Sequence, residues 1–147
     1  MAKKVWAGVD IGGTKTAVLL SANPPELIGR YEFPTLPAEG PERAINEIHA
    51  GLHRLLKDAS LKPADIRAIG VSCGSPMNRE AGIIQAPPNL PTWIDVPITK
   101  ILSEEFGAPC HLENDANAGA VAEHRFGAGK GTQNMVFLTM GTGLGAG

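Results

Sequence analysis

Three short stretches of this 147-residue chain carry the residue types that phosphoryl transfer needs. Two are glycine-rich loops, at residues 10–15 and 141–147, and the third, at residues 113–117, gathers acidic and amide side chains between them. Glycine lets backbone N–H groups approach phosphate oxygens closely, and a positioned carboxylate can accept the proton of a hydroxyl. Together the three stretches predict transfer of a phosphoryl group from a nucleotide to a hydroxyl.

The first loop has the sequence Asp10-Ile11-Gly12-Gly13-Thr14-Lys15. Asp10 ends a predicted strand, where its carboxylate can hold Mg²⁺ through water. Gly12 and Gly13 permit a positive φ and leave room for phosphate, while Thr14 and Lys15 add a hydroxyl and a cation. The loop is thus a candidate nucleotide site with a metal-binding carboxylate. An ordinary hairpin turn, with an Asx-type bond at Asp10 and Lys15 in solvent, fits the hexapeptide equally well.

The second loop follows an apolar strand predicted at 135–140 and alternates glycine with other residues. We interpret it as a second phosphate hairpin that matches the first, with Gly141, Thr142 and Gly143 as nucleotide-binding residues. Its spacing also satisfies a loose dinucleotide-binding fingerprint, which requires a helix to follow. A flexible glycine-rich segment is the simpler alternative.

The central cluster has the sequence Glu113-Asn114-Asp115-Ala116-Asn117. A helix is predicted to begin here, and Asn114 or Asp115 would be its N-cap, which needs no catalytic role. Alternatively, Asp115 is a general base that accepts the proton of a hydroxyl. Amides near such a base would hold the neighbouring hydroxyls, and Asn114, Asn117 and Asn89 are the candidates.

The composition excludes several classes of partner. Thirteen basic and fifteen acidic residues give a net charge of −2, with no basic run to attract nucleic acid. No apolar stretch approaches the ~20 residues of a membrane span, and the N-terminus lacks the features of a signal peptide. The two cysteines, Cys73 and Cys110, lie apart in apolar surroundings. We therefore expect a globular protein in a reducing, cytoplasmic setting.

The candidate residues require a scaffold of strands and helices. Strands are predicted at 5–9, 16–20, 27–33, 66–73, 110–112 and 135–140, with a short extended piece at 83–84. Helices are predicted at 41–59, 95–106 and 115–126, the second of them capped by Asp95. Residues 74–93 are rich in Pro, Gly and Asn and predict a long functional loop. Three early strands followed by alternating helices and strands indicate a mixed sheet covered by helices.

Taken together, the motifs resemble those of the ROK family of sugar kinases (repressors, open reading frames and kinases), within the actin and hexokinase superfamily. The matching stretches are residues 10–15, 113–117 and 139–147 and the sequence Asn89-Leu90-Pro91-Thr92-Trp93. The resemblance implies an α/β fold of the actin/hexokinase (ribonuclease H-like) type, a mixed sheet flanked by helices. It further implies a small N-terminal domain at 1–112 and, at 113–147, the start of a truncated second domain.

The resemblance also implies an activity, namely phosphorylation of a hexose or N-acetylhexosamine hydroxyl by ATP with Mg²⁺. Asp115 matches the family's general base, Asn89 and Asn114 match sugar-binding amides, and Asp10 matches the metal-side carboxylate. The nucleotide phosphates would lie between the two hairpins. A homo-oligomer is compatible with this family, whereas a DNA-binding repressor is not expected, because nine residues precede Asp10.

The chain departs from the family pattern in ways that leave the sugar open. Met77 and Thr92 stand where glycine is usual, near the expected sugar pocket. Cys73 and Cys110 do not match the family's zinc-binding cysteines. We also expect these 147 residues alone to be inactive as a kinase. A non-catalytic, sugar-sensing protein that keeps the kinase fold is the alternative of another class.

Overall fold

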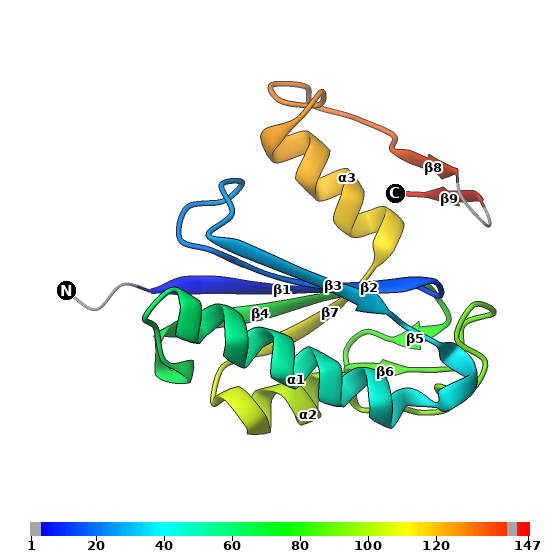
Figure 1. The fold of residues 1–147 in the computed structure, drawn as a ribbon. Helices are drawn as coiled ribbons and strands as arrows, with labels where there is room; N and C mark the ends of the chain where they lie inside the picture. Colours follow the sequence, from blue (N-terminus) through cyan, green and yellow to red (C-terminus); the bar gives the residue numbers. More distant parts are fainter. Residues whose placement is uncertain (1–3, 141–143) are drawn as a thin grey trace.

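The computed structural model describes residues 4–140 and 144–147 (Figure 1). The strands are β1 (Val5–Ile11), β2 (Lys15–Ser21), β3 (Gly29–Pro34), β4 (Ile66–Cys73), β5 (Met77–Asn78), β6 (Ile83–Ile84), β7 (Cys110–Asn114), β8 (Leu138–Met140) and β9 (Leu144–Ala146). The helices are α1 (Pro41–Asp58), α2 (Ile98–Phe106) and α3 (Asp115–Phe126), with short 3₁₀ turns η1 (Pro37–Glu39) and η2 (Pro63–Asp65). None of the described helices is long and apolar enough to cross a membrane.

Five strands form one mixed sheet in the order β3-β2-β1-β4-β7. The first three strands pair antiparallel as a meander, whereas β4 and β7 run parallel to β1. Two small two-stranded sheets, β5-β6 and β8-β9, stand outside it. The predicted mixed sheet with flanking helices is confirmed.

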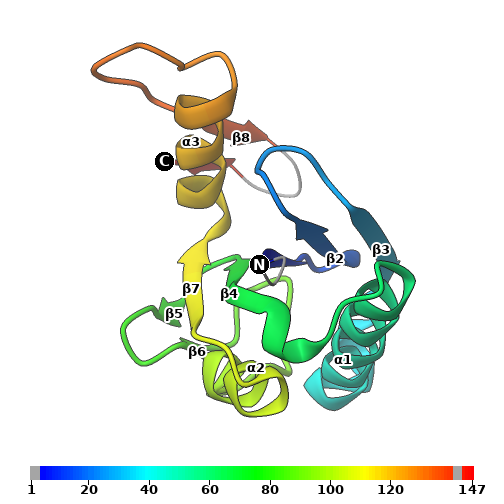
Figure 2. The same cartoon turned by 90° about the vertical axis from the view of Figure 1, so that its left-hand side faces the viewer.

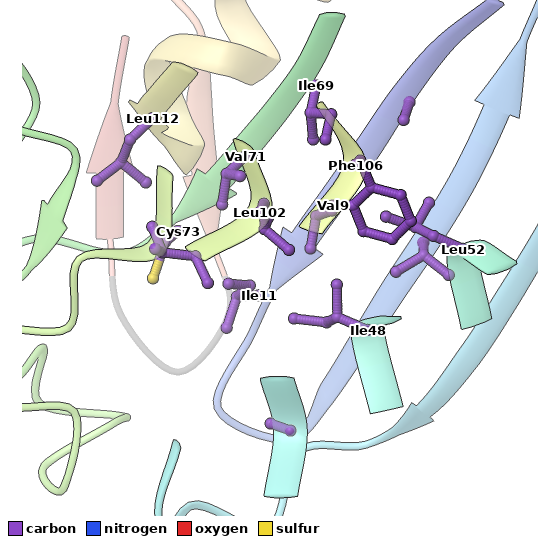
Figure 3. Packing of buried hydrophobic residues seen from close by; sticks show 14 of the residues in the cluster. Val9, Ile11, Ile48, Leu52, Ile69, Val71, Cys73, Leu102, Phe106 and Leu112 are labelled. Carbon is purple, nitrogen blue, oxygen red and sulfur yellow. The ribbon is translucent and has the colours of Figure 1, made fainter. Parts of the chain in front are cut away.

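The sheet buries one face because its strands alternate apolar and other residues. In β1, the side chains of Val5, Ala7, Val9 and Ile11 are buried, while those between them point to the other face. Helices α1 and α2 cover the buried face (Figures 1 and 2). Figure 3 shows this core, in which Ile48 and Leu52 of α1 and Phe106 of α2 meet the strands.

The opposite face of the sheet is more polar and lies toward α3. Helix α3 leaves the end of β7 and lies on the side of the sheet away from α1 and α2 (Figures 1 and 2). Its neighbours on this face include Asp10, Ser72 and Glu113, side chains that do not belong to the core. One face of the sheet therefore forms the hydrophobic core, and the opposite face carries the polar candidate residues.

Asp95 is not the N-cap of α2, contrary to the sequence prediction. The helix begins at Ile98 after Pro97, and the Asp95 carboxylate accepts a hydrogen bond from Gln85 Nε2 at 3.3 Å. The reason is a bridge between Val96 and Ile84, whose N–H and C=O groups bond reciprocally at 2.9 Å. This bridge keeps residue 96 extended, so the helix starts later.

The apolar strand predicted at 135–140 is also shorter than expected. Strand β8 covers Leu138–Met140 and pairs antiparallel with β9, and Phe137 and Gly147 extend the ladder with reciprocal bonds of 2.9 Å. Val136, outside this strand, is 75% exposed. The two strands do flank residues 141–143 as a hairpin, while the predicted nucleotide-binding residues Gly141, Thr142 and Gly143 lie outside the described residues.

Candidate active site

The candidate site lies at the carboxyl ends of three neighbouring parallel strands. Strands β1, β4 and β7 are in register, so Asp10 lies beside Ser72 and Ser72 beside Glu113. The next row pairs Cys73 with Ile11 on one side and with Asn114 on the other. Since ligands of open α/β sheets bind beyond the carboxyl ends of their strands, this edge is where a substrate would bind.

Asp10 is exposed near the end of β1 and is oriented by its neighbour. The Ser72 hydroxyl donates a hydrogen bond of 2.5 Å to Asp10 Oδ1. The bond fixes the carboxylate and leaves lone pairs of Asp10 for another ligand. Sequence reasoning missed Ser72. The alternation of β4 could have indicated it, because Val71 and Cys73 face the core and the side chain between them must then point to the opposite face.

Glycine is required in the first loop by close packing, not by a positive φ as the sequence analysis assumed. The described glycines with positive φ are Gly40, Gly82, Gly107 and Gly131. A Cβ atom on Gly12 would lie 2.8 Å from Lys15 O, and one on Gly13 would lie 2.7 Å from Asn89 Cβ. The loop closes as a tight turn in which the Gly12 N–H donates to Lys15 O at 3.0 Å.

The side chains of Thr14 and Lys15 are exposed at the end of this turn. The Lys15 ammonium lies 3.4 Å from Glu32 Oε1 on the neighbouring strand β3. The expectation of a lysine free in solvent therefore holds only in part, since this ion pair draws Lys15 toward β3. As the Lys15 side chain remains 63% exposed, its flexible stem can still bring the ammonium to another anion.

Asn89 lies against the first turn. Its side chain is close to Gly13 on one side, and a Cβ on Gly74 would lie 3.4 Å from Asn89 Oδ1 on the other. The loop is anchored by Leu90 and Trp93, which are fully buried. Thr92, one of the two departures from the family pattern, donates a hydrogen bond of 2.6 Å to Pro37 O.

Asn114, not Asp115, caps α3. Its Oδ1 accepts from the N–H groups of Ala116 at 3.0 Å and Asn117 at 3.3 Å, while its Nδ2 donates to Ser75 Oγ at 3.0 Å. Asp115 is exposed in the first turn of the helix, where its Oδ1 accepts from the Ala116 N–H at 2.8 Å. Of the two predicted caps, Asn114 is therefore the N-cap, while Asp115 only shares the Ala116 N–H with it. Both polar ends of Asn114 already have protein partners.

Glu113 supports the junction that carries Asp115. Its Oε1 accepts from the Asn114 N–H at 2.9 Å and from Asn117 Nδ2 at 3.1 Å, and its Oε2 accepts from Arg79 Nη1 at 2.9 Å. Burial acts to raise the pKa of Glu113, but these bonds and the Arg79 charge outweigh it and lower the pKa. Sequence reasoning gave no role to Arg79, whose partner lies 34 residues away.

Cys73 lies between the strand that carries Asp10 and the strand that ends before Asp115. Burial, followed by the negative charges of Asp115 and Asp10, raises the pKa of the Cys73 thiol to about 12. A buried thiol with this pKa is neutral and is no nucleophile. Asp10 lies on β1 and Asp115 follows the end of β7, so the two carboxylates come from the strands on either side of β4.

A cavity of about 340 Å³ lies between the open face of the sheet and α3. Asp10, Ser72 and Glu113 line its polar end, and Gly8 and Gly70 help to form its floor. Across the described residues, no three His, Cys, Asp or Glu side chains gather as a ready metal centre. A cation here would rely on the oriented Asp10 carboxylate with water or substrate oxygens, as Mg²⁺ commonly does.

The fold and site can now be compared with known proteins. A model of the ROK family matches residues 6–147, and the chain belongs to this family. It is 36% identical over 147 residues to a glucokinase of Thermotoga maritima, covering all of this chain and 45% of the relative. A xylose repressor of Caldicellulosiruptor bescii is 30% identical over 95% of this chain and 35% of its own length.

Solved structures agree with the family assignment. A ROK hexokinase of Thermus thermophilus superposes with a TM-score of 0.83 at 37% identity, covering 97% of this chain and 46% of that chain. A ROK family glucokinase of Streptomyces griseus, solved in complex with glucose and AMPPNP, gives 0.82 at 30% identity, with coverages of 97% and 43%. The chain thus spans less than half the length of each of these four relatives.

Proposed function

We propose that this chain is the N-terminal part of an ATP-dependent kinase that phosphorylates a hydroxyl of a hexose or N-acetylhexosamine. The observation that carries the proposal is the convergence of Asp10, the Gly12–Gly13 turn, Asn89 and Asp115 on one edge of the sheet. Similarity to glucokinases over the whole chain supports it. Glucose is the first sugar to test, because one similar structure was solved with glucose and AMPPNP.

Asp115 is proposed as the general base toward the sugar hydroxyl. Asp115 is exposed and is not the N-cap of α3, although its Oδ1 shares the Ala116 N–H with Asn114. It lies in the first turn of the helix, where a negative charge is favoured. Asn89 is proposed to hold a neighbouring sugar hydroxyl from the opposite side of the site.

Asn114 is proposed to contribute to the sugar site by a different route than expected. Since its amide bonds to Ser75 and to the start of α3, it first shapes the wall beside Asp115. Since both lone pairs of Oδ1 already accept N–H groups, a sugar hydroxyl would then accept a hydrogen bond from the second N–H of Asn114 Nδ2.

The nucleotide is proposed to bind with its phosphates at the first turn, near Gly12, Gly13 and Thr14. Gly141, Thr142 and Gly143 would approach them from the second hairpin. Asp10 would hold Mg²⁺, which neutralises charge on the phosphates when bound. The protein's task is then to position the hydroxyl and to stabilise charge, as in other phosphoryl transfers.

The domain division is part of the same proposal. Residues 1–112 would form the small domain, and residues 113–147 would begin the second. The five-stranded sheet includes β7 up to Asn114, and α3 departs from it on the other face. A boundary at the end of β7 therefore puts Asp115 where two domains would meet over a substrate.

The alternative is a sugar-sensing protein without kinase activity. The similarity to a xylose repressor supports it, as do the departures from the family pattern at Met77 and Thr92. The test is to express the complete reading frame that contains these residues and to assay it with ATP, Mg²⁺ and a panel of hexoses. Turnover supports the kinase, whereas sugar binding without turnover supports the sensor. Asn89→Ala should raise the KM for sugar more than that for ATP.

A further inference from the structure

The first turn rests on one buried residue outside every motif considered so far. Thr35 follows β3 and is completely buried. Its N–H donates a hydrogen bond of 3.0 Å to Thr14 O, and its hydroxyl donates one of 2.6 Å to Gly12 O. Thr35 therefore holds the turn by a carbonyl on each side of Gly13.

The Thr35 hydroxyl also lies 2.8 Å from the hydroxyl of Thr16, which is equally buried. A hydroxyl has one proton, and that of Thr35 is used on the Gly12 carbonyl, which can only accept. Thr16 must therefore be the donor to Thr35. The result is a chain of bonds from Thr16 through Thr35 to Gly12, in which each bond strengthens the next.

This arrangement sets the direction of the Gly13 N–H. The Gly12–Gly13 peptide is trans, and in a planar trans peptide the C=O and N–H groups point in opposite directions. Because the Gly12 carbonyl points at Thr35, the Gly13 N–H points away from it, out of the turn. Among the described residues, no hydrogen bond uses this N–H.

The segment that contains Thr35 also holds the loop of Asn89. Two residues further on, Pro37 O accepts the hydrogen bond of the Thr92 hydroxyl at 2.6 Å. Asn89 lies three residues before Thr92 and packs on Gly13, so the Asn89 loop contacts both the segment after Thr35 and the first turn. The turn, residues 35–37 and residues 89–92 thereby form a closed ring of contacts.

We propose that Thr35 is a positioning residue that aims the Gly13 N–H at a phosphate oxygen of the nucleotide. The inference deepens the proposed kinase function and rests on it. A backbone donor is useful in phosphoryl transfer only if its direction is fixed before the substrate binds. Thr35 fixes the direction of the Gly13 N–H through its hydrogen bond to the Gly12 carbonyl, without contacting the substrate.

The test compares three variants of the polypeptide encoded by the complete reading frame. Thr35→Val removes the hydroxyl at nearly constant volume and should raise the KM for ATP about tenfold, in line with the loss of a buried bond. The KM for sugar should change less than about twofold, since Asn89 keeps its own anchors. Thr35→Ser restores the hydroxyl and should restore the KM for ATP. Thr16→Val, the matched control, also deletes a buried hydroxyl but leaves the bond to Gly12 in place.

Equal effects of Thr35→Val and Thr16→Val on the KM for ATP would overturn the proposal. A parallel rise in the KM for sugar would do so as well. If Thr35→Val does not fold, Thr35→Ser still tests the proposal. Serine keeps the hydroxyl, so a tenfold rise in the KM of Thr35→Ser for ATP would show that the hydroxyl is not sufficient to position the turn, which contradicts the proposal.

Amide hydrogen exchange on the 147-residue chain separates this inference from the kinase proposal. Thr35→Val should speed exchange of the Gly12 amide, which closes the turn, more than Thr16→Val does. If the wild-type protein has no turnover, the kinase proposal fails. Faster exchange of the Gly12 amide in Thr35→Val would still show that Thr35 holds the turn. Unchanged exchange in Thr35→Val would show that Thr35 does not hold the turn.

Discussion

The two glycine-rich hairpins look alike in sequence but are supported very differently. The β1–β2 hairpin belongs to the five-stranded sheet, where β3 pairs with β2 and β4 pairs with β1. The β8–β9 hairpin pairs only with itself among the described residues and contacts α3 through Gly145, whose Cβ would lie 3.2 Å from Ala116 Cβ. Leu20 in the first hairpin is fully buried, whereas Met140 in the second is 80% exposed.

The difference shows that glycine spacing alone does not determine how well a loop is positioned. The first turn is held by Thr35 and Asn89 and by a sheet with a hydrophobic core. An isolated two-stranded hairpin is marginally stable, and further packing is needed to fix it. In the proposed kinase, the first hairpin would be preorganised, and the second would depend more on its neighbours.

Asp115 lies where the two regions meet, and its substitution should have the largest effect. Asp115→Asn in the complete protein should lower kcat by about 10²–10⁴-fold, the usual contribution of a positioned base. Folding should be unchanged, because Asn114 remains the cap. Steady-state kinetics and urea unfolding measure the two quantities. Near wild-type turnover would remove Asp115 as the base.

A matched pair of leucines tests the contrast between the hairpins directly. Leu20→Ala should destabilise the 147-residue chain by about 2–5 kcal/mol, the usual cost of a cavity in a packed core. Leu138→Ala, at a position that is 55% exposed, should change the free energy of unfolding by less than about 0.5 kcal/mol. Urea unfolding followed by circular dichroism gives both values. Similar losses would mean that the second hairpin is as firmly packed as the first.

Gly13→Ala should have the next largest effect, and its cause is close packing against Asn89, not a positive φ at residue 13. The new Cβ would lie 2.7 Å from Asn89 Cβ, so the turn and the Asn89 loop must separate. Overpacking of this kind typically costs about 1–3 kcal/mol. In the complete protein, the KM for both ATP and sugar should rise. A rise in the KM for ATP alone in Gly13→Ala would disprove the coupling.

The smallest expected effect concerns pH and involves His49 of α1. Burial lowers the pKa of His49 below 6.5, partly offset by the charge of Glu105, and its Nε2 has no partner among the described residues. Protonation therefore favours the unfolded chain, so stability is complete above about pH 6.5 and falls as the pH decreases. The loss should stay below about 1 kcal/mol because His49 is partly solvated.

Urea unfolding between pH 7.5 and about 5 tests this prediction, since Glu105 remains ionised over that range. His49→Leu should flatten the dependence, whereas His124→Gln, on the exposed end of α3, should not. An unchanged slope in His49→Leu would assign the effect to another group.

Sequence patterns predicted those elements whose residues determine them locally. The alternation in β1 and β4 and the apolar periodicity of α1 gave strands and a helix close to those observed. The family resemblance drew attention to Asn89, and the structure adds a contact that the sequence did not predict, since Asn89 packs on Gly13 of the first loop. Its role and those of the other site residues stay predictions.

Errors arose wherever a distant partner decides the local structure. The Ile84–Val96 bridge delays α2, and the position of Asn89 explains the glycine at residue 13. Ser72 and Thr35 belong to no motif, because their partners come from other strands. Only strand register brings such pairs together, and a single sequence does not reveal register.

The register of β4 imposes a rule of parity on its length. Ser72 meets Asp10 because it is an odd number of residues from the inward-facing Ile69, so its side chain emerges on the opposite face. A one-residue insertion between them would turn Ser72 toward the core and put the residue before it beside Asp10, whereas a one-residue deletion would put Cys73 there. A change of length by an odd number of residues in this strand therefore reverses the face on which Ser72 emerges, whereas the loop at 127–134 is free of that rule. Homologous chains and engineered grafts that keep the hydrogen bond between Ser72 and Asp10 must keep this count.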